Sequence, residues 1–561
     1  MTAGTASPAG PRRAAGDRRH VRWILTVALL ALTATSLPYL YGYLSRPEGS
    51  RFWAVPPYNE QDANQYLAFP RLVAANGPLV GDPFTAEPHA ARLFLPEAVL
   101  QAALVRTLGW TDLAVFQLVR VLFGVALLLA AWWLGSLLIQ QRHLQRLYMA
   151  FVCFSAGGGW LVDILRPGTV HGDAYQPESN TFFLLGNLPH LILAAALLTA
   201  LFAARVAMGR GQLRRPARLP IVITAICSFL LSWTHPWDFL SLGLGCLAYA
   251  AWLLIEEKRI PWASVIHLAV TGIAALPAAA YLLWIVRTDP VYARLANDVM
   301  VVQRWPFYLI AHGLLAAPAL FVLLNSRLRA RFALPLCWVI CVFLFMFTPV
   351  RMGGKQSRLP GGVHVPLAML AAVGVHRIAR RSAVLMASRS GARSSLSPAS
   401  RNTVAGAICW GYLGLTAIGA GAILHRHWAA YHPRTPAYFQ SRDTQHAFDQ
   451  LERLGDDSQV TLGGPYTAGW APTLADTRTY YGHWHMTLQE PQKRAARDWF
   501  FTATATPQQR AAWLNEQAIT WVIWTAWEWK APAADLRQVP GLEAVFSGRD
   551  IVLYRFRRDS R

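Results

Sequence analysis

The sequence Pro56-Pro-Tyr-Asn-Glu-Gln-Asp-Ala-Asn-Gln-Tyr-Leu-Ala-Phe69 directly follows the first long apolar segment of the chain. It carries two acids, Glu60 and Asp62, among two asparagines, two glutamines and two tyrosines. Carboxylates this close to a membrane surface are costly unless they are hydrated, paired or used. The stretch therefore predicts a polar site at the mouth of a membrane-embedded cavity, and the rest of the chain must supply that cavity.

The surrounding chain has the composition of a membrane protein. Of its 561 residues, 54% are hydrophobic and only 15% are charged. Apolar runs long enough to span a bilayer recur from residue 23 to about residue 424. The predicted spans lie near 23–44, 112–139, 147–165, 182–207, 219–235, 237–256, 262–286, 305–325, 332–350, 360–377 and 403–424.

We therefore predict a polytopic α-helical membrane protein with about eleven transmembrane helices. A basic cytoplasmic tail covers residues 1–22, and the membrane domain covers 23–427. A small α/β domain follows at 428–561, with strand-like runs at 459–462, 519–525 and 550–556 and helix-like runs at 444–454, 491–501 and 507–516. This domain is rich in tryptophan, which packs in cores, sits at membrane interfaces or stacks on sugars.

The formal net charge of +22 first suggests nucleic acid as a partner. The basic residues cluster, however, in alternate gaps between the predicted spans, as the positive-inside rule requires of a multi-pass protein. This pattern excludes a DNA-binding surface and places the N-terminus in the cytoplasm. The odd number of spans then makes the C-terminal domain extracytoplasmic. All six cysteines lie inside apolar spans without zinc-ligand spacing, so they are interpreted as core residues.

The first extracytoplasmic loop, residues 46–111, is too long to be a simple connection. It predicts a helix over 60–76, a polar turn through Glu87 and His89, and a second, amphipathic helix within 91–108 that suits a membrane interface. Function-bearing residues on the face with long loops place the chemistry outside the cytoplasm.

Ionisable residues stand at the outer ends of several predicted spans and should gather at one level of the bilayer. Such convergence is typical of an active site. Besides the catalytic candidate Asp62, the candidate substrate-binding residues are Glu60, Glu87, His89, Glu178, His190, His235, Asp238, Arg351, Lys355 and Arg358.

Asp62 is interpreted as a base that takes a proton from an acceptor hydroxyl, with a helix-start or solvated loop acid as the alternative. Arg351, Lys355 and Arg358 suit the phosphate of a lipid-linked substrate, or else lipid headgroups. For His190, a buried structural histidine is an equal alternative to substrate binding. For Asp238, the alternative is a cap of the following helix. No ligand spacing encodes a metal site, although Mg or Mn bound by these acids is an open prediction.

This pattern resembles the GT-C class of integral membrane glycosyltransferases. The matching features are the acid of Asn59-Glu-Gln-Asp62 soon after the first span, the loop helices before the second span, and the C-terminal extracytoplasmic domain. The segments 177–183, 187–190 and 234–238 are similar to those of bacterial GT-C-like proteins. The chain lacks the WWD-type motif and the Asp-x-Asp pair that mark GT-C subfamilies with well-defined motifs.

The resemblance implies an inverting glycosyltransferase of the bacterial inner membrane. Asp62 matches the catalytic loop acid of the family, and Lys355 or Arg358 would contact the phosphate of a polyprenyl-phosphate sugar donor. The acceptor would be a cell-envelope glycan, lipid or protein, and membrane lipids are further partners. Two alternatives stay open, namely a transporter or flippase of a lipid-linked glycan and a non-catalytic scaffold of envelope assembly.

Overall fold

The computed structural model of the chain describes residues 11–57, 59–166, 176–209, 218–297, 305–348, 355–389, 397–502, 505–529 and 533–557. It divides into two compact units. The bundle unit comprises Met1–Ser36, Arg120–Leu276 and Met300–His425, and the sheet unit comprises Leu37–Val119, Pro277–Val299 and Arg426–Arg561. The predicted loop 46–111 thus belongs to the same unit as the C-terminal segment.

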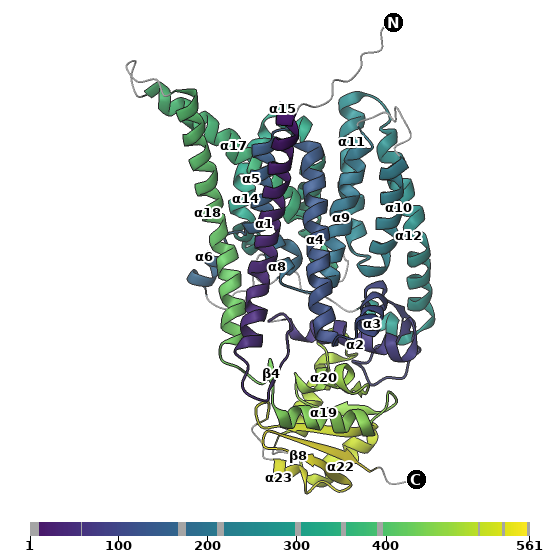
Figure 1. The fold of residues 1–561 in the computed structure, drawn as a ribbon. Coiled ribbons are helices and arrows are strands. Elements are labelled where there is room, and N and C mark those ends of the chain that lie inside the picture. The colour runs from purple at the N-terminus through teal and green to yellow at the C-terminus, as the bar shows by residue number, and fades with distance from the viewer. Residues whose placement is uncertain are drawn as a thin grey trace. The chain divides into compact units, whose positions relative to one another are not determined.

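The bundle unit is built of helices (Figure 1). Four of them, α1 (Pro11–Leu44), α4 (Asp112–Leu138), α12 (Trp262–Thr288) and α18 (Pro398–Tyr431), continue into the sheet unit. The others are α5 (Arg142–Phe154), α6 (Gly159–Leu165), η1 (Pro177–Ser179), α8 (Thr181–Leu185), α9 (Pro189–Ala207), α10 (Arg218–Thr234), α11 (Asp238–Glu257), α14 (Trp305–Leu324), α15 (Ser326–Arg331), α16 (Ala333–Met346), η2 (Lys355–Arg358) and α17 (His364–Arg389).

Within the described residues, eight helices are long and apolar enough to cross a membrane, and α10 and α16 are shorter apolar helices. The predicted break at Pro236 is confirmed, because α10 ends at Thr234 and α11 begins at Asp238. The chain is a multi-pass membrane protein. The predicted span 360–377 corresponds to α17, which starts at His364 and continues to Arg389.

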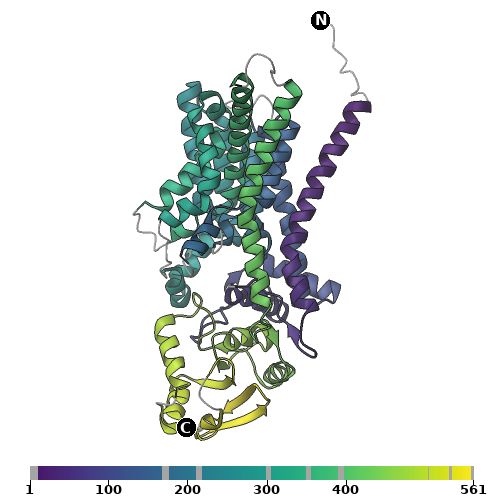
Figure 2. The same cartoon turned by 90° about the vertical axis from the view of Figure 1, so that its left-hand side faces the viewer.

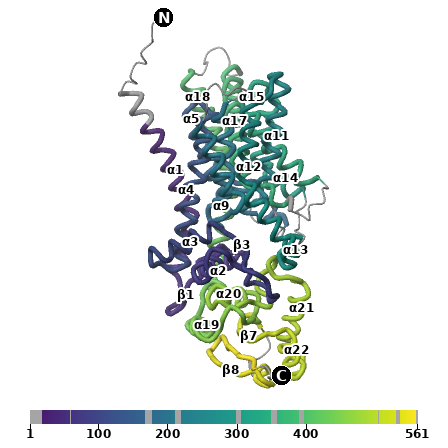
Figure 3. The backbone as a smooth tube through the Cα atoms, turned by 90° about the vertical axis from the view of Figure 1, so that its right-hand side faces the viewer, coloured from purple at the N-terminus to yellow at the C-terminus, as the bar shows by residue number. Residues whose placement is uncertain are grey.

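Close helix contacts hold this bundle together. Helices α9 and α10 pack against each other, as do α11 and α16, and α14 and α17. Helices α9, α11 and α14 can be followed in Figures 1 and 3. Gly374 of α17 lies so close to α14 that a Cβ atom there would stand 2.0 Å from the carbonyl oxygen of Pro318. Phe202 of α9 stacks on Trp338 of α16 with ring centroids 3.9 Å apart. Small residues that allow such approach are typical of helix packing in membranes.

The sheet unit contains a five-stranded sheet in the order β6-β5-β7-β9-β8. Strands of this sheet appear as yellow arrows in Figure 2. The strands are β5 (Val460–Leu462), β6 (Arg478–Thr479), β7 (Ile519–Thr525), β8 (Leu542–Ser547) and β9 (Ile551–Phe556), and the helices of this segment are α19 (Arg442–Leu454), α20 (Thr467–Leu474), α21 (Glu490–Phe500), α22 (Pro507–Glu516) and α23 (Ala533–Leu536). Strand β5 pairs in parallel with β6 and β7, whereas β9 is antiparallel to β7 and β8. The predicted small α/β fold is confirmed, although the sequence did not indicate β8 or α20.

The first loop folds onto this segment. It contains β1 (Arg51–Phe52), α2 (Glu60–Asn76), the hairpin of β2 (Leu79–Val80) and β3 (Leu93–Phe94), and α3 (Pro96–Leu108). Strand β1 pairs with β4 (Phe439–Gln440), and α2 packs against α3 and α20. The predicted helix 60–76 is confirmed. The second helix starts later than residue 91 because the chain first forms β3, and Pro96 then opens α3. Helix α13 (Pro290–Asn297) completes the unit.

Candidate functional site

Asp62 lies in the first turn of α2, where the positive end of the helix dipole favours an acid. Two rings of the C-terminal segment meet one oxygen of its carboxylate. The indole Nε1–H of Trp484 donates a hydrogen bond to Asp62 Oδ1 at 2.9 Å, and Nε2 of His483 lies 2.9 Å from the same atom. The carboxylate is thus held at one oxygen while a fifth of the side chain stays exposed.

The turn that carries His483 fixes the protonation of its ring. Nδ1 accepts hydrogen bonds from the backbone N–H groups of His485, at 3.0 Å, and Met486, at 3.1 Å. An acceptor nitrogen cannot carry a proton, so the proton of the neutral ring resides on Nε2, which faces Asp62. The turn therefore orients the buried imidazole so that Nε2 lies next to the carboxylate of Asp62.

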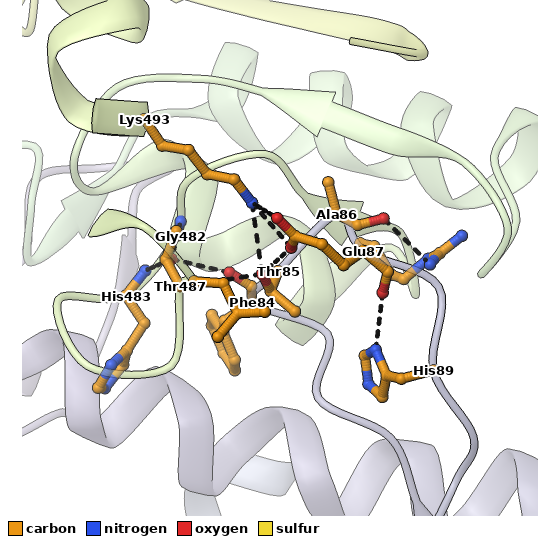
Figure 4. Close-up of polar contacts among 11 residues, drawn as sticks. Phe84, Thr85, Ala86, Glu87, His89, Gly482, His483, Thr487 and Lys493 are labelled. Atoms are coloured by element: carbon orange, nitrogen blue, oxygen red, sulfur yellow. Dashed lines mark hydrogen bonds and ion pairs between the residues drawn. The ribbon is translucent and has the colours of Figure 1, made fainter. Parts of the chain in front are cut away.

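Thr487 attaches the turn of residues 482–487 to the first loop. Its hydroxyl accepts the backbone N–H groups of Gly482 and His483 and donates to the carbonyl oxygen of Phe84 at 2.8 Å (Figure 4). The ring of Phe84 meets that of His483 edge-on, with centroids 5.6 Å apart. Residues 482–487 therefore form a rigid backing for the Asp62 carboxylate.

Glu60 precedes Asp62 by two positions at the start of α2 and is half-buried. Burial raises the pKa of the Glu60 carboxyl, and the negative charge of Asp62 adds to the rise, whereas hydrogen bonds from its own backbone, Tyr466 and Tyr438 oppose it. The hydroxyl of Tyr438 lies 3.5 Å from Glu60 Oε2. Two neighbouring carboxyl groups thus stand in different environments, an arrangement that suits division of proton-handling roles.

Glu87 forms a partly buried ion pair with Lys493 of α21 (Figure 4). The ammonium lies 2.7 Å from one carboxylate oxygen and 2.9 Å from the other, and Thr85 donates a hydrogen bond to Oε2. Burial raises the pKa of Glu87, but the hydrogen bonds from Lys493 and Thr85 and the charge of Lys493 outweigh it, so the pKa is lowered overall. Burial lowers the pKa of Lys493 against the opposing effect of Glu87.

His89 stabilises the backbone of the loop that carries Glu87. Its Nε2 accepts the backbone N–H of Asp82 at 2.7 Å, so Nδ1 carries the proton and donates to the carbonyl oxygen of Glu87 at 2.7 Å. Both ring nitrogens are thus used by the backbone of residues 82–87. Asp82 is fully buried, and burial raises its pKa to about 8.

In the bundle unit, Glu178 and Arg358 form a second ion pair. Arg358 Nη1 donates to Glu178 Oε1 at 2.7 Å, and the carboxylate is nearly inaccessible to solvent. The carbonyl oxygen of Glu178 accepts the N–H of Gly362 at 3.1 Å. Gln176 donates to the carbonyl oxygen of Ser357. Gln176 and Glu178 therefore dock onto the segment 357–362.

His235 and Asp238 stand at the junction of α10 and α11, with His235 Nδ1 3.1 Å from Asp238 Oδ1. Asp238 reaches the same segment 357–362, since a Cβ atom on Gly361 would lie 2.6 Å from its Oδ1. Next to it, Ser241 donates a hydrogen bond to the carbonyl oxygen of Leu359 at 2.8 Å. Glu178, Arg358, His235 and Asp238 thus gather around one turn.

The remaining predicted residues are placed as follows. His190 is a buried residue in the first turn of α9. Lys355 begins η2, but only its backbone is described, and Arg351 lies outside the described residues. Sequence reasoning missed His483, Trp484, Lys493 and Asp82 as partners of the predicted acids. For the first two, the sequence signal was the run Gly482-His-Trp-His485, which places two histidines beside a tryptophan.

The site's residues do not form a ready metal centre. In the part of the chain that the structure describes, no group of three or more His, Cys, Asp or Glu side chains is placed to hold a metal ion. No protein-family model and no curated protein matches the chain.

Solved structures do resemble it. The apo oligosaccharyltransferase of Archaeoglobus fulgidus matches with a TM-score of 0.59 and 14% identity over 93% of this chain and 73% of the other. The same organism's AglB, bound to an inhibitory peptide and a dolichol-phosphate, matches with a TM-score of 0.57 and 12% identity over 90% and 69%. The Archaeoglobus enzyme in complex with Zn and sulfate matches with a TM-score of 0.50 and 12% identity over 94% and 72%.

At these identities the likeness concerns the fold, and the fold is the one that the sequence resemblance implied. It covers the helical part and the C-terminal segment together. The chain is therefore a multi-pass membrane protein with the fold of the GT-C class of membrane glycosyltransferases.

Proposed function

We propose that this protein is an inverting glycosyltransferase of the bacterial inner membrane that moves a sugar from a polyprenyl-phosphate donor to a cell-envelope acceptor on the extracytoplasmic face. The GT-C fold supports this proposal. A dolichol-phosphate is bound in one structure of the archaeal AglB. The observation that carries the proposal is the Asp62 carboxylate, which Trp484 and His483 hold in a fixed orientation.

In the proposed reaction, an acceptor hydroxyl attacks the anomeric carbon of the donor sugar from the face opposite the phosphate. Asp62 removes the hydroxyl proton as the new C–O bond forms. The bond between the anomeric carbon and the phosphate oxygen breaks, and polyprenyl phosphate leaves with the electron pair. Because attack and departure occur on opposite faces, the anomeric configuration inverts. Glu60 and the His483 imidazole would assist by orienting Asp62 and the acceptor.

Arg358 and Lys355 are proposed to bind the phosphate as its negative charge develops. A guanidinium offers five N–H donors in a planar fork, so Arg358 can bind Glu178 and a phosphate at the same time. Glu178 and Asp238 would position the segment 357–362, and Glu87, His89, His190 and His235 would shape the binding region. A divalent cation, Mg or Mn, stays a prediction for the loaded enzyme.

The test is turnover of the purified protein with a panel of radiolabelled polyprenyl-phosphate hexoses and pentoses and a cell-envelope glycan extract. Replacing Asp62 with Asn should lower turnover about 10²- to 10⁴-fold, the usual contribution of a general base. Asp457→Asn, at an exposed site in the same unit, is the matched control and should leave turnover unchanged. Near-normal turnover in the Asp62→Asn variant would reject its role as base.

A different outcome would favour the alternatives. Movement of a lipid-linked glycan across the membrane of proteoliposomes, without sugar transfer, would indicate a transporter. Loss of envelope assembly on removal of the C-terminal segment, with no effect of Asp62→Asn, would indicate a scaffold.

A further inference from the structure

Trp484 is a large aromatic side chain that stays open to solvent beside the Asp62 carboxylate. It is 45% exposed, whereas Trp470 and Trp521 of the same segment are fully buried. Its indole is stacked on His483, with ring centroids 5.9 Å apart and planes 23° apart, and meets His485 at 5.3 Å. Because this apolar surface stays in water, the ring does not contribute the stabilisation that its burial would give.

The indole is fixed at both its edge and its backbone. Its Nε1–H is bonded to Asp62, and its backbone N–H donates to Gln61 Oε1 at 3.1 Å. The turn behind it is held by Thr487 (Figure 4). The backbone amides of His485 and Met486 hold it further by donating to His483 Nδ1. A rigid aromatic ring loses little conformational freedom when a ligand binds to it.

The position of the Asp62 carboxylate relative to the indole ring determines which kind of ligand can bind there. A hydrogen bond from Nε1–H lies close to the indole plane, so the carboxylate of Asp62 sits at the edge of the ring. His483 stacks on one flat face of the indole, so a ligand has to use the other face. A molecule that lies on a face and projects hydroxyl groups around its rim can reach the carboxylate from there. A pyranose or furanose ring has this form, with C–H bonds on its faces and hydroxyls at its rim.

The geometry points to a sugar ring as the acceptor, and we propose that it stacks on Trp484 while one of its rim hydroxyls is directed at Asp62. This inference rests on the proposed glycosyl transfer and narrows its acceptor from glycan, lipid or protein to glycan. Carboxylates accept hydrogen bonds and donate none when ionised, which matches sugar hydroxyls as donors.

The inference is tested by saturation-transfer-difference NMR on the full chain in lipid nanodiscs, which avoid sugar-based detergents. The probes are methyl β-D-glucopyranoside, methyl α-D-mannopyranoside and methyl α-D-arabinofuranoside, added without any donor. At least one probe should receive saturation at its ring C–H protons. Trp484→Ala should raise its Kd about tenfold, and Trp484→Phe, which keeps an aromatic face, should raise it less.

Trp110→Ala is the matched control, because Trp110 is a 50% exposed tryptophan of the same unit and should not affect the Kd. Absence of saturation transfer to all three probes, or an equal Kd in wild type and Trp484→Ala, would overturn the inference. The two proposals fail separately because no donor is present. A protein that binds a sugar through Trp484 but transfers none refutes glycosyl transfer, and one that transfers without Trp484-dependent binding refutes the stacking site.

Discussion

The ion pair between Lys493 and Glu87 gives a sharp test of how the first loop is attached to α21. The Lys493 side chain is 7% exposed and that of Glu87 is 29% exposed. The ammonium also lies 3.4 Å from the hydroxyl of Thr85, whose oxygen accepts the backbone N–H of Leu488 at 3.2 Å. Replacing Lys493 with Met keeps the length of the side chain and leaves the carboxylate without its cation.

The expected cost follows from the burial of the two groups. Removing one partner of a buried ion pair costs about 3–5 kcal/mol. The carboxylate of Glu87 retains some access to water, which lowers the expected loss to about 2–3 kcal/mol. With about 1.4 kcal/mol for each factor of ten, amide protection in this region should fall about 30- to 150-fold. The double variant Glu87→Gln with Lys493→Met leaves no buried charge and should lose about 1 kcal/mol.

Hydrogen-exchange mass spectrometry of the protein in nanodiscs measures this loss, in peptides that contain Phe84 and Leu488. Arg494→Met is the matched control on the same helix, since Arg494 is 55% exposed and pairs with Glu490 at 3.4 Å. An exposed i,i+4 pair contributes about 0.3–0.5 kcal/mol, so protection should change about twofold. The reasoning would be refuted if Lys493→Met lowered protection no more than Arg494→Met, or if the double variant lost more than the single one.

Two further variants test burial and packing elsewhere. Burial raises the pKa of Asp82 from 3.8 to about 8, so on unfolding the carboxyl ionises more readily, and stability should fall as pH rises from about 4 to about 8. Asp82→Asn should flatten this dependence, measured as amide protection at pH 5 and pH 8, and an unchanged slope would contradict the assignment. Gly374→Ala should lower the unfolding temperature of the bundle by forcing a Cβ atom against the Pro318 carbonyl, at a cost of about 1–3 kcal/mol. Gly411→Ala, which meets no neighbouring atom within 4 Å, should instead leave that temperature unchanged or raise it.

The sequence by itself determined the elements whose cause is local. The apolar spans follow from the thickness of a bilayer, which any chain that crosses it must match with about 20 apolar residues. Helix α2 follows from two acids in its first turn and the apolar residues behind them. Strand β7 and helix α22 were predicted at their observed bounds, because alternation and a Pro-containing helix start are readable within a short window.

Other elements were not predicted from the sequence, because their hydrophobic pattern is weak or because they form only by pairing with a distant strand. Strand β8 does not alternate cleanly between buried and exposed residues. Strand β3 formed from residues that were expected to be helical, since pairing with Leu79–Val80 fixes Leu93–Phe94 in extended form. Pairing of this kind depends on a partner strand, and local propensity does not reveal it.

The candidate site shows the same division. Residue types and their places at span ends identified Asp62, Glu178, Asp238 and Arg358 as candidates. Only the tertiary structure paired Asp62 with Trp484, which is 422 positions away, and Glu178 with Arg358, which is 180 positions away. A hydrogen bond is decided by distances of about 3 Å, and hydropathy and charge patterns carry no information at that scale between distant segments. The packing of the first loop onto the C-terminal segment supplies that information, and with it the tautomer of neutral His483 and the solvent-exposed position of Trp484 beside Asp62.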